Sequence, residues 1–140
     1  EDTATGRERA ARARAARPTP EAKEQAWAAA VEGNGLPNAV VEATALGFTR
    51  PGTPADLLRP FVDRYHALLD TLESRGSHAM IEAIVYGFYP RPIADRDLCD
   101  RTQAWLDGHP HAPAALRRLV VENRDPVVRA LAAQERDARD

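Results

Sequence analysis

Residues 53–72, TPADLLRPFVDRYHALLDTL, carry the strongest helical pattern in the sequence. Apolar side chains recur there every three or four positions, which is the spacing of one face of an α-helix. They are Leu57, Leu58, Phe61, Val62, Tyr65, Leu68, Leu69 and Leu72. Thr53 and Asp56 form a capping-box-like start around Pro54. Pro60 lacks the N–H that a helix interior needs, so we expect a break or kink near Arg59.

The same punctuation continues on both sides of this stretch. Proline or a capping residue precedes each apolar run, and glycine or proline follows it. The predicted neighbouring helices are Thr5–Ala16, Pro20 to Gly33, Pro37 to Gly47, Ser77–Phe88, Asp95–Gly108, Pro113–Asn123 and a last one from Asp125. Within the third of these, Val41 and Leu46 widen the apolar stripe. Residues 89–92, with two prolines, are expected to be extended.

These elements predict an all-α fold, because no strand-like alternation occurs anywhere in the sequence. About eight helices with short proline and glycine connectors imply antiparallel neighbours. Paired in order, they make four helical hairpins of roughly 30 to 40 residues. We therefore expect a stack of antiparallel hairpins, a HEAT- or armadillo-like α-solenoid. A compact helical bundle is the alternative.

Composition limits the class of protein. The 140 residues fit one helical domain, 1–140, and 44% apolar with 29% charged residues is typical of a globular chain. A net charge of −2 gives no long-range attraction for nucleic acid or an anionic membrane, and no apolar run could span a bilayer. Glu1 stands where a start methionine would, so we expect a fragment of a larger protein. The lone Cys99 fits a reducing compartment, and we expect a cytoplasmic location.

The side chains that could carry chemistry are few. His66 and Asp70 lie one helical turn apart, which favours a solvated His–carboxylate pair over a metal site. His109 and His111 fall in a proline-flanked connector, where solvated side chains are the norm. Cys99 has the setting of a small buried thiol rather than a nucleophile.

The sequence also lacks the common catalytic and phosphate-binding motifs. No histidine is followed by glutamate, and neither a Gly-x-Ser-x-Gly elbow nor a glycine-rich phosphate loop occurs. The arginines of residues 7–17 do not share one helical face and have no aromatic side chains between them for base stacking. The sequence therefore assigns no catalytic, cofactor-binding or metal-ligating residue and predicts no nucleic-acid or membrane partner.

A set of short segments, taken in order, resembles a known family over nearly the whole chain. The segments are Thr3–Gly6, Ala15–Lys23, Ala26-Trp27, Leu36–Asn38, Leu57–Phe61, Gly87–Pro90, Trp105-Leu106 and Pro113–Val120. Together they resemble the C-terminal domain of actinobacterial M1-family zinc aminopeptidases, the aminopeptidase N group.

The resemblance implies more than the residues alone. It implies a HEAT-like helical domain that packs over an upstream catalytic domain and encloses the substrate cavity, with no catalytic residue of its own. It also implies that the parent enzyme releases N-terminal residues from peptides with one zinc ion, held upstream. A free-standing helical-repeat scaffold that binds a protein partner remains the alternative. A small metal- or nucleic-acid-binding domain is a third class, which we do not expect.

Overall fold

The computed structural model describes residues 3–74 and 76–139, and all regular structure in that part of the chain is helical. The α-helices are α1 (Ala4–Ala16), α2 (Pro20–Trp27), α3 (Asn38–Phe48), α4 (Ala55–Leu58), α5 (Pro60–Leu68), α6 (His78–Gly87), α7 (Arg96–Gly108) and α8 (Ala114–Arg139). A π-helical turn, Ala28–Glu32, extends α2, and 3-10 turns cover Leu69–Ser74 and Arg91–Ile93. The all-α prediction is confirmed. The ends of the predicted domain, residues 1–2 and 140, lie outside the described residues, as does residue 75.

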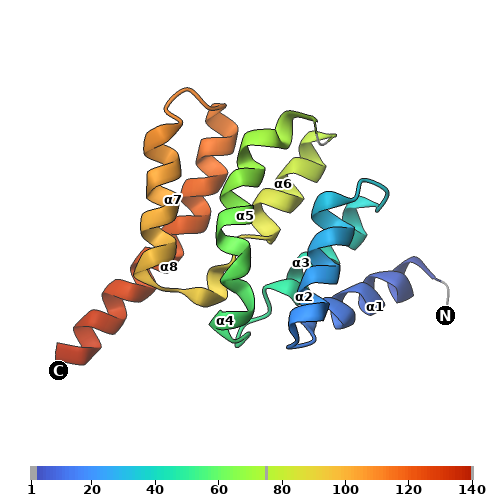
Figure 1. Cartoon of the computed structure of the whole chain (residues 1–140), viewed down its shortest axis with the longest axis horizontal. Coiled ribbons are helices and arrows are strands. Elements are labelled where there is room, and N and C mark those ends of the chain that lie inside the picture. The colour runs from blue at the N-terminus through green and yellow to red at the C-terminus, as the bar shows by residue number, and fades with distance from the viewer. Residues whose placement is uncertain (1–2, 75, 140) are drawn as a thin grey trace.

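The helices form hairpins that stand side by side in two layers (Figure 1). Helices α2, α5 and α7 make one layer, and their partners α3, α6 and α8 make the other, with α3 against α6 and α6 against α8. Helix α1 precedes the first hairpin and packs across α3 at one end of the stack. The expected stack is thus present and consistent with a solenoid. The predicted pairing of the first helix with the second is wrong. Helix α1 packs on α3, and the hairpins are α2 with α3, α5 with α6, and α7 with α8.

Local capping signals place several helix starts. Thr19, Ser77 and Asp95 each accept a hydrogen bond from the backbone N–H three residues later, at 3.1, 3.2 and 2.9 Å. The capping box expected at Thr53 is wrong. Its hydroxyl instead donates to the Arg50 carbonyl at 2.6 Å, so that the side chain closes the preceding turn and α4 begins without a side-chain cap.

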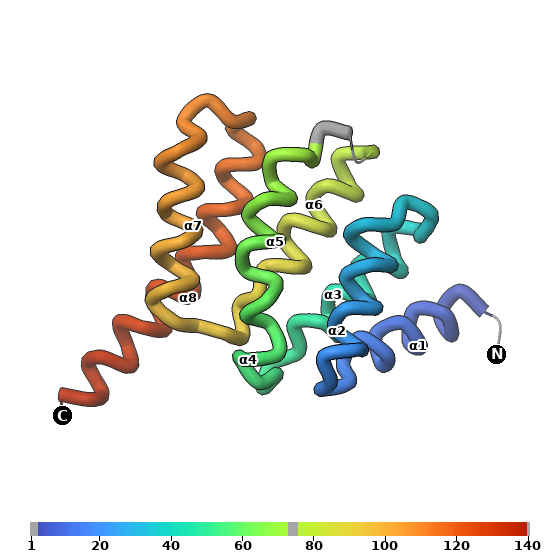
Figure 2. The backbone as a smooth tube through the Cα atoms, in the orientation of Figure 1, coloured from blue at the N-terminus to red at the C-terminus, as the bar shows by residue number. Residues whose placement is uncertain are grey.

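Two prolines act differently on the helices that contain them. The break expected near Arg59 is confirmed, since α4 ends at Leu58 and α5 begins at Pro60. The separate helix expected from Asp125 is wrong, because α8 continues through Pro126. Figure 2 shows the axis of α8 bending on its way to the C-terminus, as a proline kink does. Packing of Val120 and Val127, one on each side of the proline, keeps the helix continuous.

The connector between α6 and α7 is also tighter than expected. Residues 89–92 were predicted to be extended, but Arg91–Ile93 forms a 3-10 turn closed by a 3.1 Å bond from the Ile93 N–H to the Pro90 carbonyl. Ala94 follows in the left-handed region at φ 46° and redirects the chain into the Asp95 cap. Tertiary anchoring of Arg91, described below, favours the turn over the local preference of the prolines.

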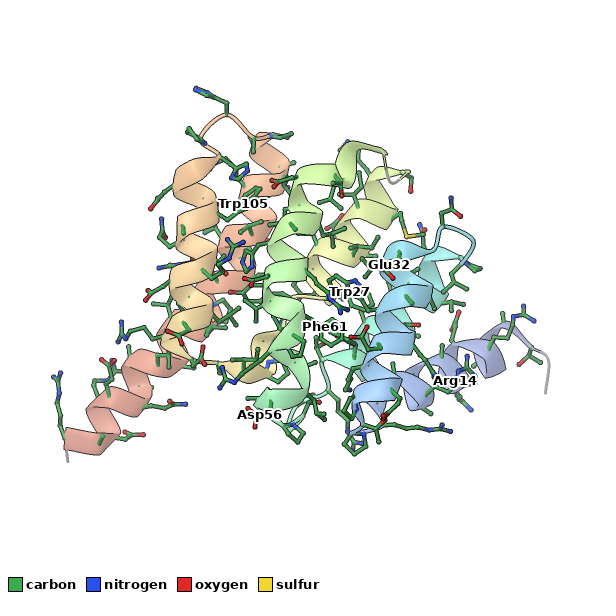
Figure 3. All side chains as sticks on the ribbon, in the orientation of Figure 1. Arg14, Trp27, Glu32, Asp56, Phe61 and Trp105 are labelled. Atoms are coloured by element: carbon green, nitrogen blue, oxygen red, sulfur yellow. The ribbon has the colours of Figure 1, made fainter. Side chains whose placement is uncertain are left out.

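An aromatic cluster joins the first two hairpins. Trp27 of α2 lies 5.4 Å from Phe61 of α5 between ring centroids. Phe48 contacts both of these rings, and Phe88 contacts the rings of Trp27 and Phe48. Figure 3 shows Trp27 and Phe61 side by side between their helices. All four rings are buried. Such pairs add to the burial of their large apolar surfaces, so this cluster is the centre of the core.

The one lysine of the chain lies in this core and has no exposed surface. The Nζ of Lys23 donates to the carbonyls of Ala15, Phe48 and Gly47 at 2.7, 3.2 and 3.4 Å. These carbonyls are at the C-terminal ends of α1 and α3, where the helix dipole favours a positive charge. Burial lowers the pKa of the Lys23 ammonium below its usual value. Lys23 therefore fastens the end helix α1 to the first hairpin.

Gly47 permits the close crossing of α1 and α3. A Cβ atom at this position would lie 2.2 Å from the backbone oxygen of Arg12 and 2.9 Å from the Cβ of Ala15. The Arg12 oxygen belongs to the backbone of α1, and the Ala15 methyl group is attached directly to that backbone. Neither atom can therefore move away unless α1 shifts as a whole. Gly47 was expected to end its helix, and α3 ends one residue later, at Phe48. The role of Gly47 in the structure is to let α1 approach α3.

Replacing Gly47 with alanine should lower the free energy of unfolding by about 2 kcal/mol. Overpacking of up to about 3 kcal/mol outweighs the roughly 1 kcal/mol that alanine gains in a helix. Urea unfolding followed by circular dichroism measures the change. Gly108→Ala is the matched control, because a Cβ there meets nothing within 4 Å. Equal effects of the two substitutions would contradict the close crossing.

Candidate functional site

The outer face of the α2–α5–α7 layer is covered by ion pairs between neighbouring helices. Arg64 of α5 binds Glu24 of α2 at 2.8 Å, and Arg101 of α7 binds Asp63 of α5 at 3.3 Å. All four side chains are largely exposed, so each pair contributes little to stability. This layer presents water with a polar, charge-paired surface.

The other layer has a different surface. Among the described residues, the exposed large apolar side chains are Leu46 on α3, Tyr86 on α6 and Val121 on α8, at 56%, 57% and 38% exposure. All three come from the α3–α6–α8 layer. Leu46, predicted to widen the buried stripe of its helix, points into solvent, because the buried face of α3 runs through Val41, Ala45 and Phe48.

Leu46 and Tyr86 line a groove of about 410 Å³ between α3 and α6. We call it the α3–α6 groove. It also contains Glu42, Ala45, Thr49, Ala79, Glu82, Ala83, Gly87 and Arg91. Ala45 and Gly87 bring the two helices together, since a Cβ on Gly87 would lie 2.6 Å from the Cβ of Ala45. Because the side chains between α3 and α6 are small at this point, the surface above them is hollowed into the groove.

Arg91 closes one side of this groove. Its Nη2 donates to the Tyr86 carbonyl at 2.6 Å and to the Asn123 side-chain oxygen at 3.1 Å. The guanidinium also lies over the rings of Tyr86 and Tyr89, 5.0 and 5.9 Å from their centroids. Burial lowers the pKa of Arg91 from its usual value. Nη2 therefore links α6 to α8, which makes Arg91 a fixed wall of the groove.

A second groove of about 430 Å³ lies between α6 and α8. Leu72, Ile81, Leu116 and Leu119 are its large apolar lining residues. Glu82 borders both grooves. The α3–α6–α8 layer is thus hollowed on both sides of α6 and is the candidate interaction surface of this chain.

The prediction for His66 is wrong. The side chain has no exposed surface, and Asp70 is not its partner. The Nδ1–H donates to the Val62 carbonyl at 2.8 Å, and Nε2 lies 2.9 Å from the Thr102 hydroxyl. Burial lowers the His66 pKa to about 4, with the nearby Arg101 as a smaller cause. The imidazole is a neutral core residue that joins α5 to α7.

Asp70 and His109 instead meet each other. The His109 Nε2 lies 2.8 Å from the Asp70 carboxylate, which also accepts a bond from the Trp105 indole at 3.1 Å. The His109 ring stacks on Trp105 at 4.4 Å between centroids. This half-buried contact ties the end of α7 to the turn after α5. The connector histidine at 109 is thus packed, while His111 is exposed as expected.

The remaining candidates are placed as follows. Cys99 is a buried free thiol, as predicted, and burial raises its pKa. The arginines of α1 are exposed. In residues 3–74 and 76–139, no three or more histidine, cysteine or acidic side chains converge in a way that could hold a metal ion. No helix in the described part of the chain has the length and apolar character needed to cross a bilayer.

Sequence reasoning missed the α3–α6 groove. Glu42, Glu82 and Tyr86 were not singled out, and Leu46 was assigned to the core. Each is an ordinary helix residue, and one helix alone contains no signal for a groove. The signal that could have found it is the surplus of apolar residues on residues 38–48, which exceeds what one buried stripe can hold.

Stacked helical hairpins with ion pairs on one layer and exposed apolar side chains beside grooves on the other define an all-α domain with a surface open to a partner. The chain belongs to the ERAP1-like C-terminal domain family, whose model matches residues 1–129. It is also 46% identical over 137 residues to Aminopeptidase N of Streptomyces lividans. That match covers 97% of this chain and 16% of the relative.

Proposed function

We propose that this chain is the C-terminal accessory domain of an M1-family zinc aminopeptidase, where it encloses the cavity in which peptides lose their N-terminal residue. The observation that carries the proposal is the match to Aminopeptidase N over 97% of the chain but only 16% of the relative. The catalytic domain then belongs to the remaining length of the parent protein. It is the main partner of this domain and holds the zinc ion.

The physical task of such a domain is enclosure. Stacked hairpins, the first two joined by the aromatic cluster, form a stiff wall, which limits access to short or unfolded peptides. Excluding bulk water from the cavity strengthens the electrostatic interactions of the catalytic groups. This assignment places no catalytic, cofactor or metal-binding residue in the chain and needs no nucleic acid or membrane. A cytoplasmic parent agrees with the buried free thiol of Cys99.

The test compares a longer polypeptide that ends in residues 1–140 with the same polypeptide truncated before Glu1. The longer form should hydrolyse aminoacyl-nitroanilides and short peptides but leave the N-termini of folded proteins intact. The truncated form should cleave the N-termini of folded proteins more readily relative to short peptides, because the enclosing wall is gone. Residues 1–140 alone, with zinc added, should show no turnover. Turnover by the isolated chain, or unchanged discrimination after truncation, would contradict the proposal.

The rival function is a free-standing scaffold that binds a protein along one layer. The apolar side chains of the α3–α6 groove favour it, since such a surface also suits a separate partner. The reading frame of the gene separates the two. A His-Glu-x-x-His segment several hundred residues upstream of Glu1 in the same frame would rule the scaffold out.

A further inference from the structure

We propose that the α3–α6 groove binds a peptide segment in which a lysine or arginine side chain neighbours an apolar one. The groove volume of about 410 Å³ falls within the usual range of ligand pockets. Its apolar contribution comes from Leu46 and Tyr86, more than half exposed on opposite walls. An apolar side chain placed between them would remove both from water.

The preference for a cation comes from the groove's carboxylates. Glu42 projects from α3 and Glu82 from α6, so the two flank the groove from opposite walls. Both are exposed, and neither forms a hydrogen bond or ion pair with any described residue. Glu24 and Asp63 of the other layer are, by contrast, already paired with arginine. The groove therefore offers an added positive charge two uncommitted carboxylates, one on each wall.

The one cation that lines the groove does not offset this preference. The Arg91 guanidinium is held by the Tyr86 carbonyl, the Asn123 side chain and the faces of two tyrosine rings. Its Nη2 is thus already used within the domain, and its charge lies against the two tyrosine rings. The net character of the open groove is acidic and apolar.

The walls are also fixed before any ligand binds. The Thr49 hydroxyl bonds the Ala45 carbonyl at 2.8 Å and lies 3.4 Å from the Gly87 carbonyl, across the gap between α3 and α6. Arg91 links α6 to α8 in the same region. A preformed groove spends less free energy on ordering when a flexible peptide binds. The source of the peptide rests on the proposed function, in which the parent acts on peptides.

The experiment measures binding of a dye-labelled decapeptide of arginine, leucine and serine to the 140-residue chain by fluorescence anisotropy. We expect a dissociation constant below about 1 mM at low salt, weakening as salt screens the charges. The variant Glu42→Gln/Glu82→Gln should bind roughly fivefold to tenfold more weakly, as loss of two exposed ion pairs implies. Leu46→Ser should also weaken binding.

Matched variants make the result specific. Glu24→Gln/Asp63→Asn removes the same charge from the opposite layer and should bind like the wild type. Glu42→Lys/Glu82→Lys should instead favour a peptide with glutamate in place of arginine. Circular dichroism verifies that each variant is folded. The changed side chains in the groove are exposed, so their replacement should leave the fold intact.

Three outcomes would overturn the proposal. They are no binding up to millimolar peptide, equal weakening by the two charge-matched double variants, and self-association that Leu46→Ser abolishes. The last would make a second copy of the chain the occupant of the groove. These outcomes leave the truncation test of the proposed function untouched. Peptide binding here combined with a failed truncation test would identify a peptide-binding domain outside an aminopeptidase.

Discussion

Replacing Lys23 with methionine should lower the free energy of unfolding by about 4 kcal/mol. Methionine fills a similar volume but leaves the carbonyls of Ala15 and Phe48 buried without the ammonium. Hydrogen bonds to a charged group contribute about 1.5–3 kcal/mol each. When the ammonium is removed, the buried carbonyls keep the cost of their desolvation without a bond to offset it. Methionine also removes the cost of burying a positive charge, a cost that is seen in the lowered pKa of Lys23. This gain offsets part of the lost stability.

Chemical unfolding in urea at neutral pH, followed by far-UV circular dichroism, measures the effect. Arg17→Met is the control, because it removes one positive charge from an exposed site near α2. A surface substitution of this kind changes stability by within about 0.5 kcal/mol. If both variants unfold at the same urea concentration, the desolvation penalty of the ammonium cancels its three bonds.

Acidification should destabilise the protein through His66. The unfolded histidine takes up a proton near its usual pKa of 6.5, whereas the folded one does so only near 4. Between these values the unfolded state binds more protons, so the free energy of unfolding falls as the pH falls. The shift corresponds to about 3 kcal/mol, lost progressively from about pH 6.5 and complete below about pH 4.

The cause of this loss is the charge rather than a broken bond. In the neutral ring, the Nδ1–H donates to Val62 and the Thr102 hydroxyl donates to Nε2. After protonation, Nε2–H donates to the Thr102 oxygen, and the hydroxyl turns to the Leu98 carbonyl 2.9 Å away. The Tyr89 hydroxyl can donate to Thr102 in both states. Because every hydrogen bond survives, burial of the positive charge is what destabilises the fold.

Unfolding free energies of wild type and His66→Gln, compared at several pH values, test this account. The difference between the two proteins should shrink by about 3 kcal/mol between pH 6.5 and pH 4, because glutamine takes up no proton. His111→Gln, at an exposed position, should follow the wild type. Parallel curves for wild type and His66→Gln would show that His66 is not responsible for the acid sensitivity.

Features that depend on a few neighbouring residues were predicted well. The caps at Thr19, Ser77 and Asp95 and the break at Pro60 each rest on contacts within three or four positions. Features that need a distant partner were not. Pro126 should have ended a helix, but buried side chains on both sides of it hold α8 together. Residues 89–92 should have been extended, but Arg91 reaches Asn123, 32 positions away.

The burial of single residues also depended on distant partners and was predicted less well than the helix ends. His66 and Leu46 were assigned to the wrong side of their helices, because a helical stripe has no sharp edge until neighbouring helices cover it. Thr102 of α7 and Tyr89 of the connector before α7 cover the histidine side of α5, and both follow His66 by more than twenty positions. Leu46 is 56% exposed, since no helix of the described residues covers it, and the groove beside it was therefore not predicted.

The sequence by itself determined the helical class, most helix boundaries and the resemblance to an aminopeptidase domain. These follow from backbone preferences and from hydrogen bonds that close within one turn, which need no distant partner. Only the tertiary structure decided which helices pair, why the one lysine is buried and where the apolar groove lies. Those depend on how closely helices cross at residues such as Gly47 and Gly87, where absence of a side chain sets the distance between backbones.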